Sequence, residues 1–479
     1  IGIGGIGMSG IAQLLLRCGI KVSGSDLKES KIIKELENLG ADIFIGHNAQ
    51  NLKDVNLIIY SSAIKEDNPE VIEARKLGIP LIKRAQALAQ LMQEKTVITV
   101  TGSHGKTTTT SLVSYLLLEA GLFPSVAIGG ILRNIDTNAC LGNGKYFVAE
   151  ADESDGSFLY YRPKYSIVTN IDREHLDYYK DFEKEVDAFK EFLSRTEEGG
   201  CVFGCSDDPV LKNMLKNYKN KSVLFGLTDS ADIYPKNIEL KDLSSEFDCY
   251  YKDKFIDRFH LALGGRHNIS NALSVIALGL ELGIDLKFIK NTLSNYKGAK
   301  RRLEIKFNQD NIMVIDDYAH HPTEIMATLQ AIRNIKYNRI IAVFQPHRYT
   351  RTQLLLEEFG KSFDSADYVI ITDIYAANEA PIEGVNARSI CDKIKKYFPD
   401  KRVEFSPKEE ITGRILEIIK PWDLVITLGA GDIVKINDEL VEKFVGGTVY
   451  QAFLCAKSYH RWHAPVNGII VKVYVQEGS

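Results

Sequence analysis

The residues that decide the fold run Thr96-Val97-Ile98-Thr99-Val100-Thr101-Gly102-Ser103-His104-Gly105-Lys106-Thr107-Thr108. A β-branched run, a glycine-framed turn and then a helical pattern predict a strand, a loop and a helix. In such a unit backbone N–H groups cradle phosphates, a lysine reaches the β and γ oxygens, and a hydroxyl holds Mg²⁺. Val100 stands where the strict eight-residue pattern has glycine, so the sequence predicts a shortened phosphate loop.

Two further strands of this block end in side chains that suit a catalytic site. Tyr146–Ala149 is predicted to be a buried strand that ends at Glu150, and Ser166–Thr169 is a strand followed by His175. Ligands in parallel sheets bind at the carboxyl ends of strands, so we expect Glu150 to hold a metal ion near the phosphates. His175 is either a metal ligand or a neutral hydrogen-bonding group. A purely structural histidine is the alternative.

Two later features of the same block suit a nucleotide. Asn268 and Asn271 precede an apolar helical pattern and offer the paired donor and acceptor that an adenine edge requires. Helix capping is the alternative for such asparagines. Lys300, Arg301 and Arg302 form a basic run that can close a wall around phosphates, and a solvated charge run is the alternative.

The N-terminal block contains a second glycine turn, Gly2-x-Gly4-x-x-Gly7, which opens a predicted helix at Met8–Cys18. Glycines let the backbone approach a pyrophosphate, and the helix start offers free N–H groups. Asp26 follows about 20 residues later, where a ribose-binding acid is expected. The pattern fits NAD, FAD or a nucleotide-sugar, with a ligand-free tight turn as the alternative. Strands are predicted at Lys21–Ser23 and Leu57–Tyr60. Residue 1 already lies at the turn, so we expect the first strand to be truncated.

The third block ends two predicted strands in polar clusters. The strand Met313–Ile315 leads into Asp316-Asp317-Tyr318-Ala319-His320-His321-Pro322, and Ile340–Phe344 leads into Gln345-Pro346-His347-Arg348-Tyr349-Thr350-Arg351. Polar clusters at two strand ends of one sheet indicate a site. If Arg348 and Arg351 begin a helix, they share a face and can bind a carboxylate in a fork. A small substrate with a carboxylate fits this block better than a second nucleotide.

Length and composition indicate an ordinary globular protein. At about 150 residues per domain, 479 residues predict about three domains. Hydrophobic residues make up 45% and charged residues 25%, which excludes a disordered or collagen-like chain. No apolar run reaches the ~18 residues that span a bilayer, and a net charge of −4 gives no reason to expect nucleic acid or an anionic membrane as partner. Seven scattered cysteines favour a reducing cytoplasm over a disulfide scaffold.

Taken together, these motifs resemble the Mur ligases of bacterial peptidoglycan synthesis over roughly residues 1–445. The resemblance rests on GIGGIGMSG at 2–10, TGSHGKTTT at 101–109, EADESDGSF at 150–158, NIDREHLD at 170–177, GRHNISNA at 265–272, DDYAHHPTE at 316–324, QPHRYTRT at 345–352 and YAANEAPIEG at 375–384. The family implies an α/β protein of three domains. We expect a Rossmann-like UDP-sugar-binding domain at 1–95, a central P-loop ATPase-type domain at 96–295 and a Rossmann-like, amino-acid-binding C-terminal domain at 296–445.

The resemblance also implies a reaction, and the motifs are most similar to the branch that adds L-alanine. ATP would phosphorylate the lactyl carboxylate of UDP-N-acetylmuramate, and the amine of L-alanine would attack the acyl phosphate, with ATP and Mg²⁺ as cofactors. We expect a monomer or a weak homodimer.

The family's functional residues carry over onto matching positions of this chain. The implied catalytic residues are Lys106, Glu150 and His175, and the implied Mg²⁺ ligands are Thr107, Glu150 and His175. The implied ATP contacts are Gly102, Ser103, His104, Gly105, Lys106, Thr107, Thr108, Asn268, Asn271 and Arg302. The implied UDP-sugar contacts are Gly4, Gly5, Gly7, Met8, Ser9 and Asp26. The implied L-alanine contacts are Tyr318, His320, Arg348 and Arg351.

Other hypotheses remain open at this point. A Rossmann oxidoreductase would explain the first glycine turn but not the Gly-Lys-Thr loop. A nucleotide-binding but inactive fragment, or a Mur ligase that adds D-glutamate, a diamino acid or a dipeptide, is also compatible. Glycine and L-serine differ from L-alanine by little pocket volume. Residues 446–479 are an appendage in which 459–468 resembles part of phosphatidylserine-decarboxylase-like proteins, and we expect a fusion junction or an assembly artefact without activity.

Overall fold

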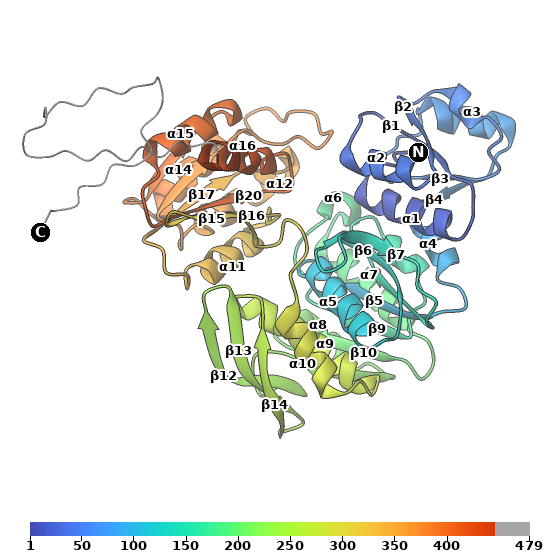
Figure 1. Ribbon diagram of the computed structural model, residues 1–479, viewed down its shortest axis with the longest axis horizontal. Coiled ribbons are helices and arrows are strands. Elements are labelled where there is room, and N and C mark those ends of the chain that lie inside the picture. Colours follow the sequence, from blue (N-terminus) through green and yellow to red (C-terminus); the bar gives the residue numbers. More distant parts are fainter. Residues whose placement is uncertain (446–479) are drawn as a thin grey trace, which may run out of the picture. The chain divides into compact units, whose positions relative to one another are not determined.

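The computed structural model describes residues 1–445, which pack into two compact units, Ile1–Arg302 and a second that begins at Leu303 (Figure 1). Both units are α/β, with helices between mostly parallel strands, so the predicted fold class is confirmed. The predictions for 446–479 lie outside the described residues.

The first unit begins with short parallel strands surrounded by helices. β1 (Ser23–Asp26) pairs with β2 (Asp42–Ile45), and β3 (Ile58–Tyr60) pairs with β4 (Leu81–Lys83). Residues 1–3 lie between the two pairs, because the Ile1 amine donates to the Ile59 carbonyl (2.7 Å) and the Gly2 N–H donates to the Ser25 carbonyl (2.8 Å). The helices here are α1 (Ile6–Arg17), α2 (Lys31–Asn38), η1 (Ala49–Leu52), α3 (Pro69–Leu77) and α4 (Arg84–Leu91).

A ten-stranded sheet forms the centre of the first unit, in the order β14-β13-β12-β11-β10-β9-β5-β8-β6-β7. Its strands are parallel from β12 to β6, while β7, β13 and β14 run antiparallel to their neighbours. The strands are β5 (Thr96–Thr101), β6 (Ser125–Leu132), β7 (Thr137–Cys140), β8 (Tyr146–Glu150), β9 (Tyr165–Val168), β10 (Cys201–Cys205), β11 (Lys221–Phe225), β12 (Ile233–Lys241), β13 (Ser244–Tyr251) and β14 (Lys254–Leu261). The helices are α5 (Lys106–Glu119), η2 (Ser157–Tyr160), α6 (Leu176–Tyr179), α7 (Phe182–Ser194), α8 (Pro209–Lys216), α9 (Arg266–Glu281) and α10 (Leu286–Asn295).

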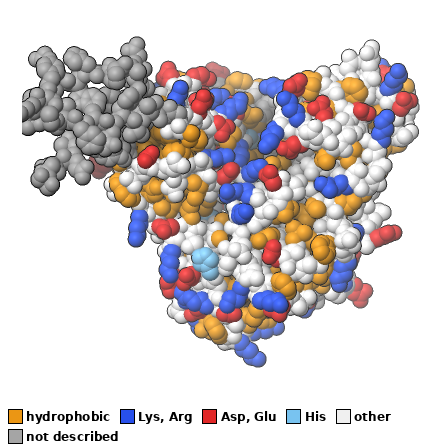
Figure 2. Space-filling model, viewed as in Figure 1, with side chains coloured by type: hydrophobic (Ala, Val, Ile, Leu, Met, Phe, Trp, Pro, Cys, Tyr) orange, Lys and Arg blue, Asp and Glu red, His pale blue; other side chains and the backbone are white. Residues whose placement is uncertain are grey.

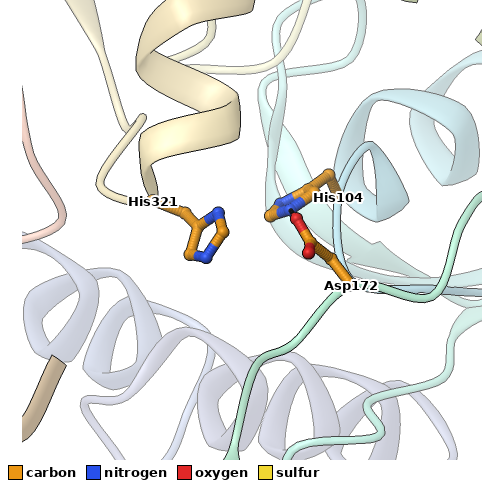
Figure 3. Close-up of side chains that lie close together, drawn as sticks. All are labelled: His104, Asp172 and His321. Atoms are coloured by element: carbon orange, nitrogen blue, oxygen red, sulfur yellow. Dashed lines mark hydrogen bonds and ion pairs between the residues drawn. The ribbon is translucent and has the colours of Figure 1, made fainter. Parts of the chain in front are cut away.

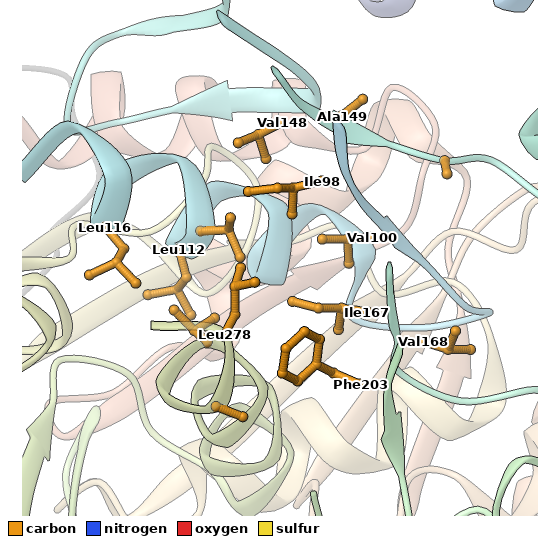
Figure 4. Packing of buried hydrophobic residues seen from close by; sticks show 14 of the residues in the cluster. Ile98, Val100, Leu112, Leu116, Val148, Ala149, Ile167, Val168, Phe203 and Leu278 are labelled. Carbon is orange, nitrogen blue, oxygen red and sulfur yellow. The ribbon is translucent and has the colours of Figure 1, made fainter. Parts of the chain in front are cut away.

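The core of this sheet fixes the strand on which the phosphate loop stands. Ile98 and Val100 of β5 lie in one apolar cluster with Leu112 of α5 and Leu278 of α9 (Figure 4). All four side chains are fully buried. Burial of each such side chain contributes about 1.5–3 kcal/mol to stability. This packing fixes the end of β5 and the start of α5, between which the phosphate loop lies.

The second unit is a six-stranded sheet with helices, in the order β15-β16-β20-β17-β18-β19. All neighbours are parallel except β15 and β16. Val314, Ile341 and Val425 on neighbouring strands belong to its core. The strands are β15 (Glu304–Gln309), β16 (Ile312–Asp317), β17 (Arg339–Phe344), β18 (Tyr368–Ile371), β19 (Arg402–Phe405) and β20 (Asp423–Leu428). The helices are α11 (Pro322–Ile332), α12 (Tyr349–Leu354), α13 (Leu356–Lys361), α14 (Arg388–Tyr397), η3 (Lys408–Glu410), α15 (Ile411–Ile418) and α16 (Val434–Val445).

The outer surface is mixed in character. On the face drawn in Figure 2, Lys and Arg side chains are interspersed with Asp and Glu. No helix in the described part of the chain combines the length and the hydropathy that a bilayer crossing requires.

Candidate active site

The phosphate loop links β5 to α5, as the sequence predicts. Gly102 and Gly105 adopt the left-handed region, with φ of 123° and 84°. A Cβ on Gly102 would collide with the Thr169 hydroxyl, and a Cβ on Gly105 would lie 2.8 Å from Oδ1 of Asn271. Both positions therefore require glycine, because the backbone conformation disfavours a side chain and no space is left for one. Gly105 caps α5 without a side-chain bond, so the loop leads directly into the N–H groups of the first helical turn.

Residues after β9 fasten this loop. The His104 N–H donates to Oδ1 of Asn170 (2.8 Å), and the Thr169 hydroxyl donates to the His104 carbonyl (2.6 Å). Nε2 of His104 lies 2.9 Å from Oδ2 of Asp172, and the two side chains face each other in Figure 3. The Asp172 N–H donates to the Ser103 hydroxyl (2.8 Å). These bonds hold both central residues of the loop, Ser103 and His104.

Lys106 is held as a cation at the start of α5. Its Nζ donates to the Gly102 carbonyl (2.7 Å) and to Oε1 of Glu153 (2.7 Å). Burial lowers the pKa of Lys106, but the charges of Glu153 and Asp152 outweigh burial and leave that pKa above its ordinary value. Glu153 is fully buried. The lysine therefore carries a positive charge beside the loop at any physiological pH.

The predicted metal ligands fall into two groups. The Thr107 hydroxyl donates to Oε1 of Glu150 (3.1 Å), and Oε2 of Glu150 accepts the Gly129 N–H (2.8 Å). Burial raises the pKa of Glu150, as expected for a carboxylate that a cation would stabilise. His175 has a φ of 56°, and its Nε2 lies 3.5 Å from Oε1 of Glu153. Thr107 and Glu150 therefore form one hydrogen-bonded pair, and His175 lies beside Glu153 instead.

The predicted adenine and phosphate residues occupy different places. Asn268 donates to the Gly264 carbonyl (2.8 Å), which is a local bond at the start of α9. Asn271 lies 3.4 Å from Oδ1 of Asn268 and packs on Gly105, so it contacts the phosphate loop itself. Arg302 is the last residue of the first unit and lies in a turn. Burial raises the pKa of Tyr296, and the charge of Arg302 opposes that rise.

The N-terminal glycine turn forms the second predicted site of this unit. The Gly4 N–H donates to Oδ2 of Asp26 (2.9 Å), so this acid stabilises the turn. Gly5 is the N-cap of α1 and makes no side-chain cap bond. Met8 and Ser9 have buried side chains, and the Ser9 hydroxyl donates to the Ile6 carbonyl (2.9 Å). The Met8 and Ser9 side chains therefore contribute to the packing of α1.

Sequence reasoning missed Arg84, the first residue of α4. A Cβ on Gly7 would lie 2.9 Å from Nη1 of Arg84, and Nη2 of Arg84 lies 3.9 Å from Oδ2 of Asp152. The arginine thus lies between the glycine turn and the acidic end of β8. Arg84 directly follows the carboxyl end of β4, but a strand of three residues is too short to be recognised by its sequence pattern.

The predicted amino-acid-binding residues lie at the carboxyl ends of β16 and β17 in the second unit. The ring of His320 contacts those of Tyr318 and His347, each with centroids 5.5 Å apart. Arg348 is the N-cap of α12, which begins at Tyr349, and its φ is 71°. Nη1 of Arg351 donates to Nδ1 of His347 (3.1 Å).

His347 was also missed, although it lies inside a motif that sequence reasoning identified. Its ring stacks on Tyr375, with centroids 5.7 Å apart. Burial lowers the pKa of His347 to about 3, with smaller contributions from His320, Arg351 and Arg348. The imidazole is therefore neutral and accepts the Arg351 bond. It thereby helps to orient the Arg351 guanidinium.

Comparison with known proteins agrees with this arrangement. Three Mur ligase family models match, the Mur ligase family catalytic domain over 1–96, the Mur ligase middle domain over 100–279 and the Mur ligase glutamate ligase domain over 301–431. A phosphatidylserine decarboxylase model matches 413–479, which agrees with the resemblance of the appendage and overlaps the last described helices.

Curated relatives and a solved structure span nearly the whole chain. The UDP-N-acetylmuramate–L-alanine ligase of Syntrophus aciditrophicus is 45% identical over 92% of this chain and 92% of its own. The one of a Sulfurihydrogenibium species is 47% identical over 92% and 96%. The crystal structure of UDP-N-acetylmuramate-alanine ligase from Thermotoga maritima matches with a TM-score of 0.80 and 31% identity, over 93% of this chain and 98% of that one. With its phosphate loop, its glycine turn and these three family matches, the chain belongs to the Mur ligase family.

Proposed function

We propose that this chain is an ATP-dependent ligase that joins L-alanine to the lactyl carboxylate of UDP-N-acetylmuramate through an acyl phosphate, in peptidoglycan precursor synthesis. The observation that carries the proposal is the phosphate loop with Lys106 at its end, which stands in the same compact unit as the glycine turn. The names of the relatives support the same reaction and favour L-alanine over D-glutamate, a diamino acid or a dipeptide. The phosphate loop disfavours a Rossmann oxidoreductase, because hydride transfer does not require a Gly-Lys-Thr loop.

The ATP end of the reaction is assigned to the first unit. A carboxylate is a poor electrophile until one of its oxygens leaves as phosphate, and phosphoryl transfer needs positioning and charge neutralisation. The loop N–H groups would hold the phosphates, and Lys106 would neutralise their β and γ oxygens. Asn271 would brace the loop at Gly105, which adds a positioning role to its predicted contact with ATP.

The residues around β8 suit Mg²⁺. Glu150 and Thr107 offer a carboxylate and a hydroxyl within one hydrogen bond of each other, and hard oxygen ligands are what this ion prefers. Glu150 and Thr107 would hold the ion, with His175 as the third predicted ligand. When bound there, Mg²⁺ would offset negative charge on the phosphates. Glu153 would keep Lys106 and His175 oriented, because it lies within 2.7 Å of one and 3.5 Å of the other.

The two other substrates are assigned to the remaining sites. The uncapped start of α1, with Gly4, Gly5 and Gly7, would bind the diphosphate of the UDP-sugar, and Asp26 would bind its ribose. In the second unit, Arg348 and Arg351 would bind the carboxylate of L-alanine, beside Tyr318 and His320. This division of labour follows the predicted domains 1–95, 96–295 and 296–445. We also propose that the protein is cytoplasmic, since scattered cysteines suit a reducing compartment. We propose that it is a monomer or a weak homodimer.

Phosphate release tests the proposal. The protein is incubated with ATP, Mg²⁺ and UDP-N-acetylmuramate, and with L-alanine, glycine, L-serine, D-glutamate or no amino acid. We expect release that depends on L-alanine and a product with the mass of UDP-N-acetylmuramoyl-alanine. Release that depends on D-glutamate alone would move the chain to another branch of the family. ATP binding without release in every mixture would identify a nucleotide-binding but inactive chain.

A further inference from the structure

Arg84 lies between the glycine turn at the start of α1 and Asp152, an acid that follows the end of β8. On one side its Nη1 lies close to Gly7, in the first turn of α1. On the other side its Nη2 lies 3.9 Å from Oδ2 of Asp152, which follows the end of β8. Burial raises the pKa of Asp152, but the charges of Lys106 and Arg84, with other contacts, leave that pKa below its ordinary value. Arg84 therefore stands where a molecule bound to the glycine turn would meet the phosphate loop.

The guanidinium of Arg84 has donors to spare. Arginine carries five N–H donors in a fixed fork. Within residues 1–445 the Arg84 side chain makes no hydrogen bond, and its only ion pair is the long contact with Asp152. The side chain is 21% exposed, so most of it has lost contact with water. Polar groups in such positions are normally satisfied, and an anionic ligand would satisfy this one.

The backbone of Arg84 is fixed in advance. Arg84 directly follows β4, and the Lys83 N–H before it donates to Oε1 of Gln86 (2.8 Å). Ala85 and Leu88 of α4 are buried in the core of the ten-stranded sheet. A side chain on such a rigid base loses little conformational freedom when it binds. This placement suits a ligand contact better than a solvent-exposed charge.

We propose that Arg84 is a substrate-binding residue that holds an anionic group of the UDP-sugar between the glycine turn and the phosphate loop. This inference rests on the proposed function, because it presumes a UDP-sugar at α1. UDP-N-acetylmuramate offers two suitable groups, its diphosphate and its lactyl carboxylate. Both present pairs of oxygens that match a guanidinium fork, which a lysine cannot reproduce.

Direct binding of UDP-sugars, measured by calorimetry without ATP, tests the proposal. We expect Arg84→Gln to weaken UDP-N-acetylmuramate binding about tenfold to a hundredfold, as for a lost hydrogen-bonded charge. Arg84→Lys keeps the charge without the fork and should fall between this variant and wild type. ATP affinity should stay within about threefold. Arg75→Gln is the matched control, because Arg75 lies on α3 of the same unit and pairs with Glu66 on the surface.

A second UDP-sugar separates the two anionic groups. UDP-N-acetylglucosamine has the diphosphate but no lactyl carboxylate. Equal weakening for both sugars in Arg84→Gln supports a contact with the diphosphate, and weakening for UDP-N-acetylmuramate alone supports a contact with the carboxylate. Binding within about twofold of wild type for both sugars would overturn the inference and leave Arg84 as a partner of Asp152. If Arg84→Gln lowers the melting temperature, the UDP-sugar affinity of Arg84→Lys is compared with that of wild type in its place. Wild-type protein that binds neither sugar would overturn the proposed function and this inference together.

Discussion

Nζ of Lys106, at the end of the phosphate loop, lies 2.7 Å from Oε1 of Glu153, which follows β8. The carboxylate is fully buried, so the pair is not a surface ion pair of small effect. Breaking such a pair leaves one charge buried without compensation, which costs about 3–5 kcal/mol. We expect Glu153→Leu to lower the free energy of unfolding by about 3 kcal/mol, measured by urea denaturation. A loss below about 1 kcal/mol would mean that Lys106 finds other partners. The control is the same substitution at the surface carboxylate Glu66, with the free energy of unfolding measured in the same way.

Lys106 itself should matter for turnover and not for UDP-sugar binding. Lys106→Met keeps most of the unbranched side chain and removes its charge, so the β and γ oxygens lose their cation. We expect L-alanine-dependent phosphate release to fall by about 10³-fold or more, with UDP-N-acetylmuramate affinity within about twofold of wild type. Loss of UDP-sugar binding in this variant would contradict the division of labour between the two sites.

Gly105 should tolerate no side chain. Its φ of 84° disfavours a Cβ, and that Cβ would lie 2.8 Å from Oδ1 of Asn271. We expect Gly105→Ala to displace the start of α5 and to weaken ATP binding at least tenfold. The control is Gly121→Ala at the far end of the same helix, where φ is 69° and a Cβ would meet nothing within 4 Å. Gly121→Ala should cost only about 1–2 kcal/mol of conformational strain and leave ATP affinity unchanged. Equal ATP affinity in both variants would remove the steric role of Asn271.

Arg348 should act on the amino acid alone. A guanidinium on a carboxylate makes charge-assisted bonds, and their loss appears mainly as weaker substrate binding. We expect Arg348→Ala to raise the KM for L-alanine at least tenfold while the KM for ATP changes little. Arg333→Ala, which breaks an exposed pair with Asp367 in the same unit, is the control. An unchanged alanine KM would exclude Arg348 from this role.

His347 should make stability depend on pH. Its pKa is lowered to about 3 in the folded protein, from an ordinary 6.5 that the unfolded chain retains. The unfolded chain therefore binds more protons between these values, so stability is lost as pH falls below about 6.5. The loss should be about 1 kcal/mol between pH 6 and pH 5. His347→Asn keeps an acceptor for Arg351 and does not titrate. Urea denaturation at several pH values should show a steeper dependence for wild type, and identical slopes would contradict the assignment.

The sequence was sufficient for the parts of the site that local geometry determines. The loop around Gly102 and Gly105 was predictable because strand, turn and helix signals follow one another within a few residues. The strand predicted at Lys21–Ser23 was wrong, and it runs Ser23–Asp26. The Ser25 carbonyl accepts the N–H groups of Gly2 and Ile3, and that tertiary pairing outweighs the apolar pattern.

Contacts between distant segments could not be predicted in this way. Glu153 and His347 lie in motifs that sequence reasoning identified, but their partners depend on how helices pack. Arg84 meets Gly7 and Asp152 only after α4 crosses from one sheet to the other. The three antiparallel strands β12 to β14 also carry no chemical motif, so nothing in the pattern separated them from the central block.

The packing of α1 on β7 has a consequence for how ligands act on each other. Gly10 of α1 lies against Asn138 and Ala139, and Nδ2 of Asn138 donates to the Ile6 carbonyl (2.6 Å). The helix that would bind the UDP-sugar is therefore bonded to an edge strand of the sheet that carries the phosphate loop. A ligand that orders one end of this connection also reduces the entropy that remains to be lost at the other. Each nucleotide should then tighten the binding of the other by the same factor, because such coupling is reciprocal.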